Sequence, residues 1–94
     1  MERVSLDGRK WRAPEDFYRA LLAALGAPEW HGHNLDALEE SLRDGDINHL
    51  NPPLALQVIG VDDMTPEARL MVQRFHKLVE DLRTSGVLVS LDLT

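Results

Sequence analysis

Hydrophobic residues recur along the chain at two spacings, one typical of strands and one typical of helices. The order in which these spacings occur predicts the secondary structure. Short runs typical of strands cover residues 3–6, 54–59 and 87–93. Segments with helical spacing cover residues 14–25, 35–43 and the stretch from Pro66 to Gly86. Strands separated by helices pair in parallel through right-handed crossovers. We therefore expect a small two-layer α/β domain in which helices cover a three-stranded parallel sheet.

The boundaries of these elements carry recognisable signals. Pro14 occupies the first position of the first predicted helix, and Gly26 ends that helix. Pro66 begins the most regular apolar repeat in the chain, for which Gly86 supplies the C-terminal cap. The run 54–59 is apolar enough for a central strand that is buried on both faces apart from its glutamine.

The segment from Trp30 to Leu42 joins a bent loop to a capped, acidic helix. Gly32 permits a backbone turn, and Asn34 can accept a hydrogen bond from the first free amides of the helix. Asp36 lies where the positive end of the helix dipole favours an anion. At about 100° per residue, the leucines and the carboxylates separate onto different faces. The leucines are Leu35, Leu38 and Leu42, the carboxylates are those of Asp36 and Glu40, and the carboxylate of Glu39 lies between the two faces. This pattern predicts a surface that binds cations.

Composition and charge narrow the class of protein. The chain of 94 residues suits one small domain spanning 1–94, and we expect no second one. It has no cysteine, no apolar start of signal-peptide type and no apolar run long enough for a membrane span, which favours a cytoplasmic protein. A formal net charge of -6 disfavours direct contact with nucleic acid or a membrane and favours a basic protein partner.

Catalytic and metal chemistry find little support in the sequence. His31 and His33 alternate in a loop without a third histidine, so we expect no metal site. Asp36 and Glu40 could form an acid–base pair, but no apolar pocket around them is implied. The serines belong to no nucleophile motif, and the glycines form no phosphate loop. We expect no enzyme activity, no cofactor and no small-molecule substrate.

Simpler interpretations of the acidic helix and of the two tryptophans remain open at this point. Arg43 follows Glu39 by four residues and Glu40 by three, the spacing of exposed ion pairs worth roughly 0.3 kcal/mol each. Trp30 lies in a loop, where its ring could either close the core or contact a partner. Trp11 is expected in the core or at its rim.

The stretch that begins at Pro28 resembles the barstar family of ribonuclease inhibitors, whose motif reads aromatic-x-Gly-x-Asn-Leu-Asp-Ala-Leu-Trp-Asp. The residues that match as they stand are Gly32, Asn34, Leu35, Asp36, Ala37 and Leu38. Glu39 and Glu40 occupy the positions of the family's tryptophan and second aspartate. The resemblance implies that all helices lie on one side of the sheet.

The resemblance also implies a function, namely an intracellular inhibitor of a guanyl-preferring, barnase-like microbial ribonuclease. It would block the enzyme in a 1:1 complex without a cofactor, with carboxylates where RNA phosphates otherwise bind. The predicted contact residues are Trp30, His31, Gly32, Asn34, Leu35, Asp36, Glu39, Glu40, Arg43 and, counting back from Gly86, Asp81, with Glu80 as the neighbouring possibility. A second interpretation is a barstar-like interaction module for another basic protein or nuclease, because Glu39 replaces an aromatic anchor.

Overall fold

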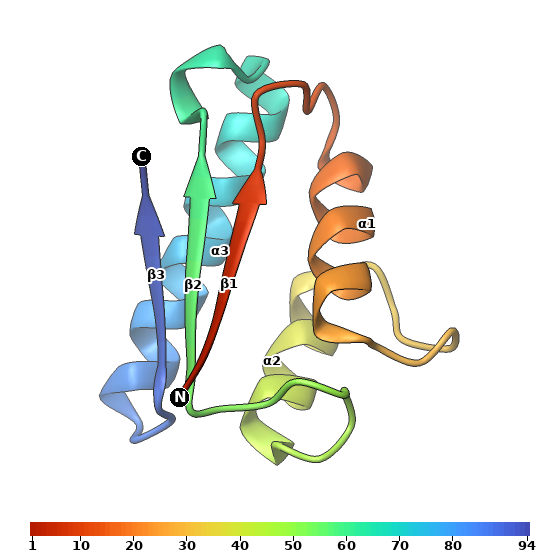
Figure 1. Cartoon of the computed structure of the whole chain (residues 1–94), viewed down its shortest axis with the longest axis vertical. Helices are drawn as coiled ribbons and strands as arrows, with labels where there is room; N and C mark the ends of the chain where they lie inside the picture. Colours follow the sequence, from red (N-terminus) through yellow and green to blue (C-terminus); the bar gives the residue numbers. More distant parts are fainter.

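The computed structural model describes residues 1–94, and its elements follow one another in the predicted order (Figure 1). The strands are β1 (Glu2–Asp7), β2 (Leu54–Ile59) and β3 (Val89–Leu93). The helices are α1 (Pro14–Leu25), α2 (Leu35–Asp44) and α3 (Pro66–Thr84), with a short 3-10 helix, η1, at Val61–Asp63. The strands are parallel in the order β1-β2-β3. This confirms the predicted α/β fold, although the sequence pattern did not reveal η1.

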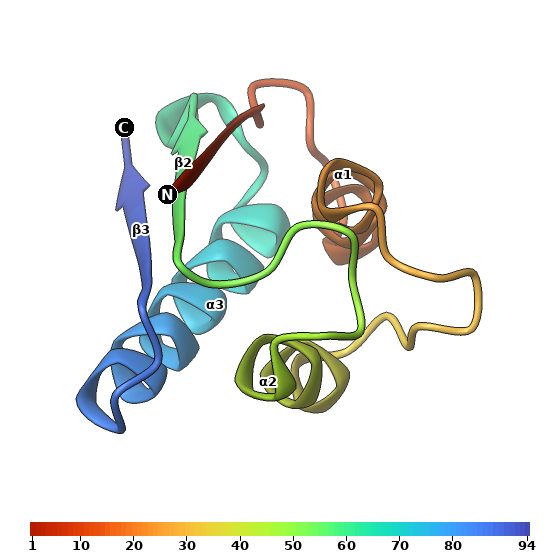
Figure 2. The ribbon, with the colours of Figure 1, turned by 60° about the horizontal axis from the view of Figure 1, so that its bottom comes forward.

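One face of the sheet carries the core, and the other is left open by the helices (Figure 2). Across the strands, Val4 aligns with Leu56 and Leu56 with Leu91 on the inner face. On the open face, Ala55 and Ile59 of β2 are only half-buried. The prediction that β2 is buried on both faces is therefore wrong, because all three helices lie on one side.

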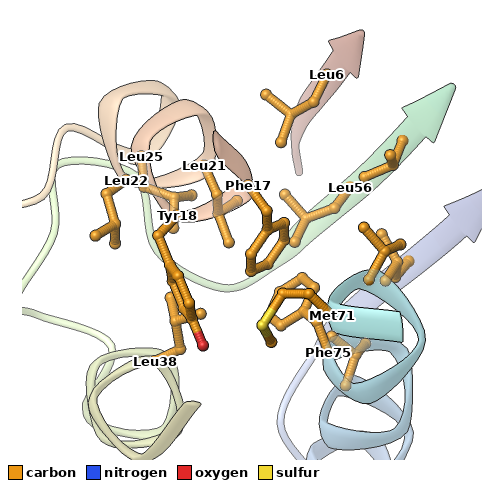
Figure 3. Close-up of a cluster of buried hydrophobic side chains, with 14 of the residues drawn as sticks. Leu6, Phe17, Tyr18, Leu21, Leu22, Leu25, Leu38, Leu56, Met71 and Phe75 are labelled. Atoms are coloured by element: carbon orange, nitrogen blue, oxygen red, sulfur yellow. The ribbon is translucent and has the colours of Figure 1, made fainter. Parts of the chain in front are cut away.

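An aromatic cluster joins the first helix to the third at the centre of the core (Figure 3). The ring centroids of Phe17 in α1 and Phe75 in α3 lie 5.1 Å apart, and those of Trp11 and Phe17 lie 5.8 Å apart in an edge-to-face arrangement. Phe17 and Phe75 are inaccessible to solvent or nearly so. Trp11 is 7% exposed, which confirms its expected place in the core.

The acidic helix α2 packs against α3 and stands apart from the sheet (Figure 2). Leu38 and Leu42 fix its inner side, each at most 1% exposed. The Tyr18 side chain of α1 also points toward Leu38 of α2 (Figure 3). The position of α2 at the edge of the helical layer leaves its outer side free.

The end of α3 explains where the last strand begins. Gly86 adopts the left-handed region at φ 97°, and the Val87 N–H donates back to the Leu82 carbonyl at 2.9 Å. Because this amide completes the cap of α3, β3 starts at Val89 and not at Val87 as predicted. Leu88, between the two, is 65% exposed.

The N-cap of α2 supports a first prediction about stability. Asn34 Oδ1 accepts a hydrogen bond from the Ala37 N–H at 2.7 Å. We expect Asn34→Ala to lower the free energy of unfolding by about 1 kcal/mol, because one amide of the first turn loses its partner. Urea unfolding measures this change. Asn34→Gly should cost only a few tenths of that, and equal stability of Asn34→Ala and the unmodified protein would contradict the prediction.

Candidate functional site

The outer face of α2 gathers four charged side chains on one exposed surface. Asp36, Glu39, Glu40 and Arg43 are all exposed, and at 3.6 residues per turn they span about 100° of the helix circumference. Glu39 pairs with Arg43 at 3.8 Å, whereas Asp36 and Glu40 make no ion pair. Both members of the Glu39–Arg43 pair are about half exposed, so water screens this attraction. The outer face of α2 therefore keeps carboxylates available for a cation.

Trp30 stands beside this face on the loop 26–34, which we call the Trp30 loop. Its side chain is 74% exposed, so the interpretation of this ring as a plug on the core is wrong. Trp30, Gly32 and Glu40 line a small hollow together. The structure thus places a large aromatic ring next to a free carboxylate, an arrangement suited to contact with a protein partner.

Gly32 serves this loop through its small size and not through an unusual backbone angle. Its φ is not among the positive values in the chain. A Cβ atom at this position would lie 2.8 Å from Asn34 Nδ2 and 3.2 Å from Ala37 Cβ. A side chain at this position would therefore collide with the first turn of α2, onto which the loop packs closely.

A groove between α2 and α3 borders the other side of the outer face. It contains the carboxylates of Asp36 and Glu39 from α2 and that of Asp81 from α3. Arg74 and Lys77 of α3 lie in the same groove, and Lys77 Nζ is 3.7 Å from Asp81 Oδ2. Packing of α2 on α3 thus joins the late acidic residue of α3 to the acidic helix, and it brings two basic groups there as well.

His31 is the predicted contact residue whose side chain the structure withdraws from solvent. It is 4% exposed and hydrogen-bonds through both ring nitrogens, to the Gly32 carbonyl at 2.8 Å and to Ser41 Oγ at 2.9 Å. Both ring nitrogens are engaged within the protein, so neither is free for a partner, although the residue lines the hollow beside Trp30 and Glu40. This burial could not be predicted from the sequence, because tertiary packing covers the ring.

His33 ties the Trp30 loop to α1. Its Nδ1 atom lies 2.6 Å from Glu15 Oε1, and its ring stacks on Tyr18 with centroids 6.1 Å apart. Burial raises the pKa of the Tyr18 hydroxyl above its ordinary value. No group of three or more His, Asp or Glu side chains is arranged to hold a metal ion. The two loop histidines thus have separate structural partners.

Most of the contact residues predicted from the sequence lie around the outer face of α2. Those that line it or its flanking hollows are Trp30, His31, Gly32, Leu35, Asp36, Glu39, Glu40 and Asp81. Asn34 is occupied as the N-cap, and Arg43 also donates to Ser85 Oγ at 3.2 Å. Sequence reasoning missed Arg74 and Lys77. For Lys77 there was a signal, since it precedes Asp81 by four residues, the spacing of a helical ion pair.

The fold and this surface define a small α/β protein that exposes a preformed acidic helix beside an aromatic loop. The family model Barstar, described as Barstar (barnase inhibitor), matches residues 1–91, and the chain belongs to the barstar family. The family predicted from the loop and helix motif is thereby confirmed. A comparison with curated protein sequences finds no match. None of the three helices is long and apolar enough to span a membrane.

Proposed function

We propose that this protein is a cytoplasmic inhibitor of a basic, barnase-like ribonuclease with guanyl preference, and that it covers the enzyme's active site. The single observation that carries the proposal is the outer face of α2. There Asp36, Glu39 and Glu40 are exposed on one side of a helix, next to the exposed ring of Trp30. Membership in a family described by barnase inhibition supports the same conclusion.

The proposed mechanism is occupation of the phosphate-binding positions of the enzyme by carboxylates. A ribonuclease binds RNA phosphates with cationic side chains, and these form charge-assisted hydrogen bonds with carboxylates equally well. Asn34 and Gly45 cap the two ends of α2, so the carboxylates are held on a formed helix before binding. Less conformational entropy is then lost on association. Tight, non-covalent 1:1 inhibition needs no cofactor and no chemistry by the inhibitor.

A second candidate function is a barstar-like module for another basic protein or nuclease. Glu39 favours it, because this position faces the groove with Asp81 and carries no aromatic ring. Aromatic residues supply much of the binding energy in many interfaces, whereas a carboxylate helps only opposite a cation. The two candidates share the surface and differ in the identity of the partner.

The proposed function predicts a 1:1 complex with a basic ribonuclease and loss of that enzyme's activity. We expect isothermal titration calorimetry with barnase, and with other basic microbial ribonucleases, to give a stoichiometry of one for at least one enzyme. The inhibitor alone should cleave no RNA. Binding without inhibition would favour the interaction module. Neither binding nor inhibition across the panel at micromolar concentrations would overturn the proposed ribonuclease target.

A further inference from the structure

We infer that His31 is a positioning residue, held in its Nδ1–H tautomer by a buried relay through Ser41 to Asn48. The three side chains are 4%, 1% and 6% exposed. His31 Nε2 lies 2.9 Å from Ser41 Oγ, and Asn48 Nδ2 donates to the same oxygen at 3.2 Å. His31 and Ser41 line the hollow beside Trp30 and Glu40, and with Asn48 they reach from the Trp30 loop across α2 to the next loop.

The hydrogen-bond partners determine where the protons lie. The Gly32 carbonyl can only accept, so the bond of 2.8 Å to His31 Nδ1 requires a proton on that nitrogen. In the neutral ring Nε2 is then an acceptor, and only the Ser41 hydroxyl can supply a hydrogen to it. The Leu38 carbonyl is a second acceptor near that hydroxyl, at 3.3 Å, but the bond to Nε2 is shorter. The proton of the neutral His31 ring and that of the Ser41 hydroxyl therefore have defined places.

The relay fastens the Trp30 loop at a point next to the tryptophan. Trp30 is 74% exposed, so little packing holds its ring, and its position follows from the backbone on either side. On one side the His31 N–H donates to the Pro28 carbonyl at 2.9 Å. The loop after α2 is joined to the same region by the His49 N–H, which donates to the Gly26 carbonyl at 3.2 Å. The buried His31 side chain completes this attachment.

The consequence for binding rests on the proposed function. An aromatic residue held in place before association loses less entropy in the complex than one on a mobile loop. His31 would thus act on affinity through Trp30 and not by touching the ribonuclease. The relay itself is a property of the free protein, so it can be tested without any partner.

The first measurement uses the unmodified, ¹⁵N-labelled protein. Long-range ¹H–¹⁵N correlation of the imidazole ring distinguishes the two neutral tautomers. We expect the Nδ1–H pattern for His31 at a pH where the ring is neutral. An Nε2–H pattern would overturn the inference, since the Nδ1 lone pair would then face the Gly32 carbonyl oxygen. This measurement decides the question even where a variant fails to fold.

The second measurement uses Ser41→Ala and the backbone amide order parameter of Trp30. We expect this value to fall from about 0.85 to below about 0.6, because Nε2 loses its donor and the loop is freed. The amide of the buried Trp11 serves as a control within the same molecule and should not change. An unchanged Trp30 order parameter in folded Ser41→Ala would overturn the inference.

A destabilised control separates positioning from a general loss of stability. Val79→Ala removes a fully buried side chain of α3, outside the relay. It should lower the free energy of unfolding and leave the Trp30 order parameter at its original value. If Val79→Ala mobilised the Trp30 loop as much as Ser41→Ala, the relay would have no specific role. Because no ribonuclease is present, these outcomes are independent of whether the proposed inhibition is correct.

Discussion

Replacing Glu40 with alanine is expected to weaken the complex with the ribonuclease by about 2 to 5 kcal/mol while leaving the melting temperature unchanged. Glu40 is exposed on the outer face of α2 and makes no ion pair in the free protein. Its removal therefore costs the fold little. In the complex, by contrast, a cation of the enzyme would remain desolvated without its counter-charge. Calorimetry of both proteins with the same ribonuclease measures the difference.

Matched variants sharpen this test. Glu40→Gln keeps the length of the side chain and removes only its charge, so it should lose much of the same affinity. Glu67→Ala removes an exposed carboxylate at the start of α3, outside the proposed surface, and should change the affinity little. Full affinity in Glu40→Ala would mean that this carboxylate is simply solvated and contacts no partner.

The elements around the proposed surface could be predicted because their signals are local. Asn34 caps α2 through an amide three residues away, and Gly45 ends the helix in the left-handed region. The outer face of α2 follows from helical periodicity alone, so Asp36 and Glu40 could be assigned to it without knowledge of the fold. Trp30 could be assigned to a loop, but no helical or strand periodicity covers this residue, so its exposure could not be predicted.

Other features depend on segments that are distant in the sequence. The burial of His31 requires Ser41 and Asn48, which fold onto it from α2 and the loop that follows. Arg74 lies in the groove only because α2 packs against the part of α3 that carries this residue. Likewise, β2 is half-buried on one face because all helices gather on the other side, and apolar composition alone could not indicate this. Tertiary packing, not local propensity, decides each of these cases.

Salt is expected to slow association with a basic ribonuclease far more than it changes dissociation. The net charge of -6 includes carboxylates concentrated on α2, which attract a cationic active site before any contact forms. Between ionic strengths of about 0.01 M and 0.15 M, the screening length falls from about 30 Å to about 8 Å. Steering of this kind accelerates encounter by roughly 10- to 1000-fold, and most of that gain should disappear over this range. Stopped-flow kinetics at several salt concentrations measures both rates.

Two triple variants with the same change in net charge locate the origin of this steering. Neutralising the carboxylates of the outer face of α2 should flatten the salt dependence of the association rate strongly. Neutralising three carboxylates near η1 and the start of α3 should flatten it much less, because those charges lie outside the proposed surface. The first variant is Asp36→Asn, Glu39→Gln and Glu40→Gln, and the second is Asp62→Asn, Asp63→Asn and Glu67→Gln. Equal flattening by both would mean that overall charge steers the partner and that the proposed surface lies elsewhere.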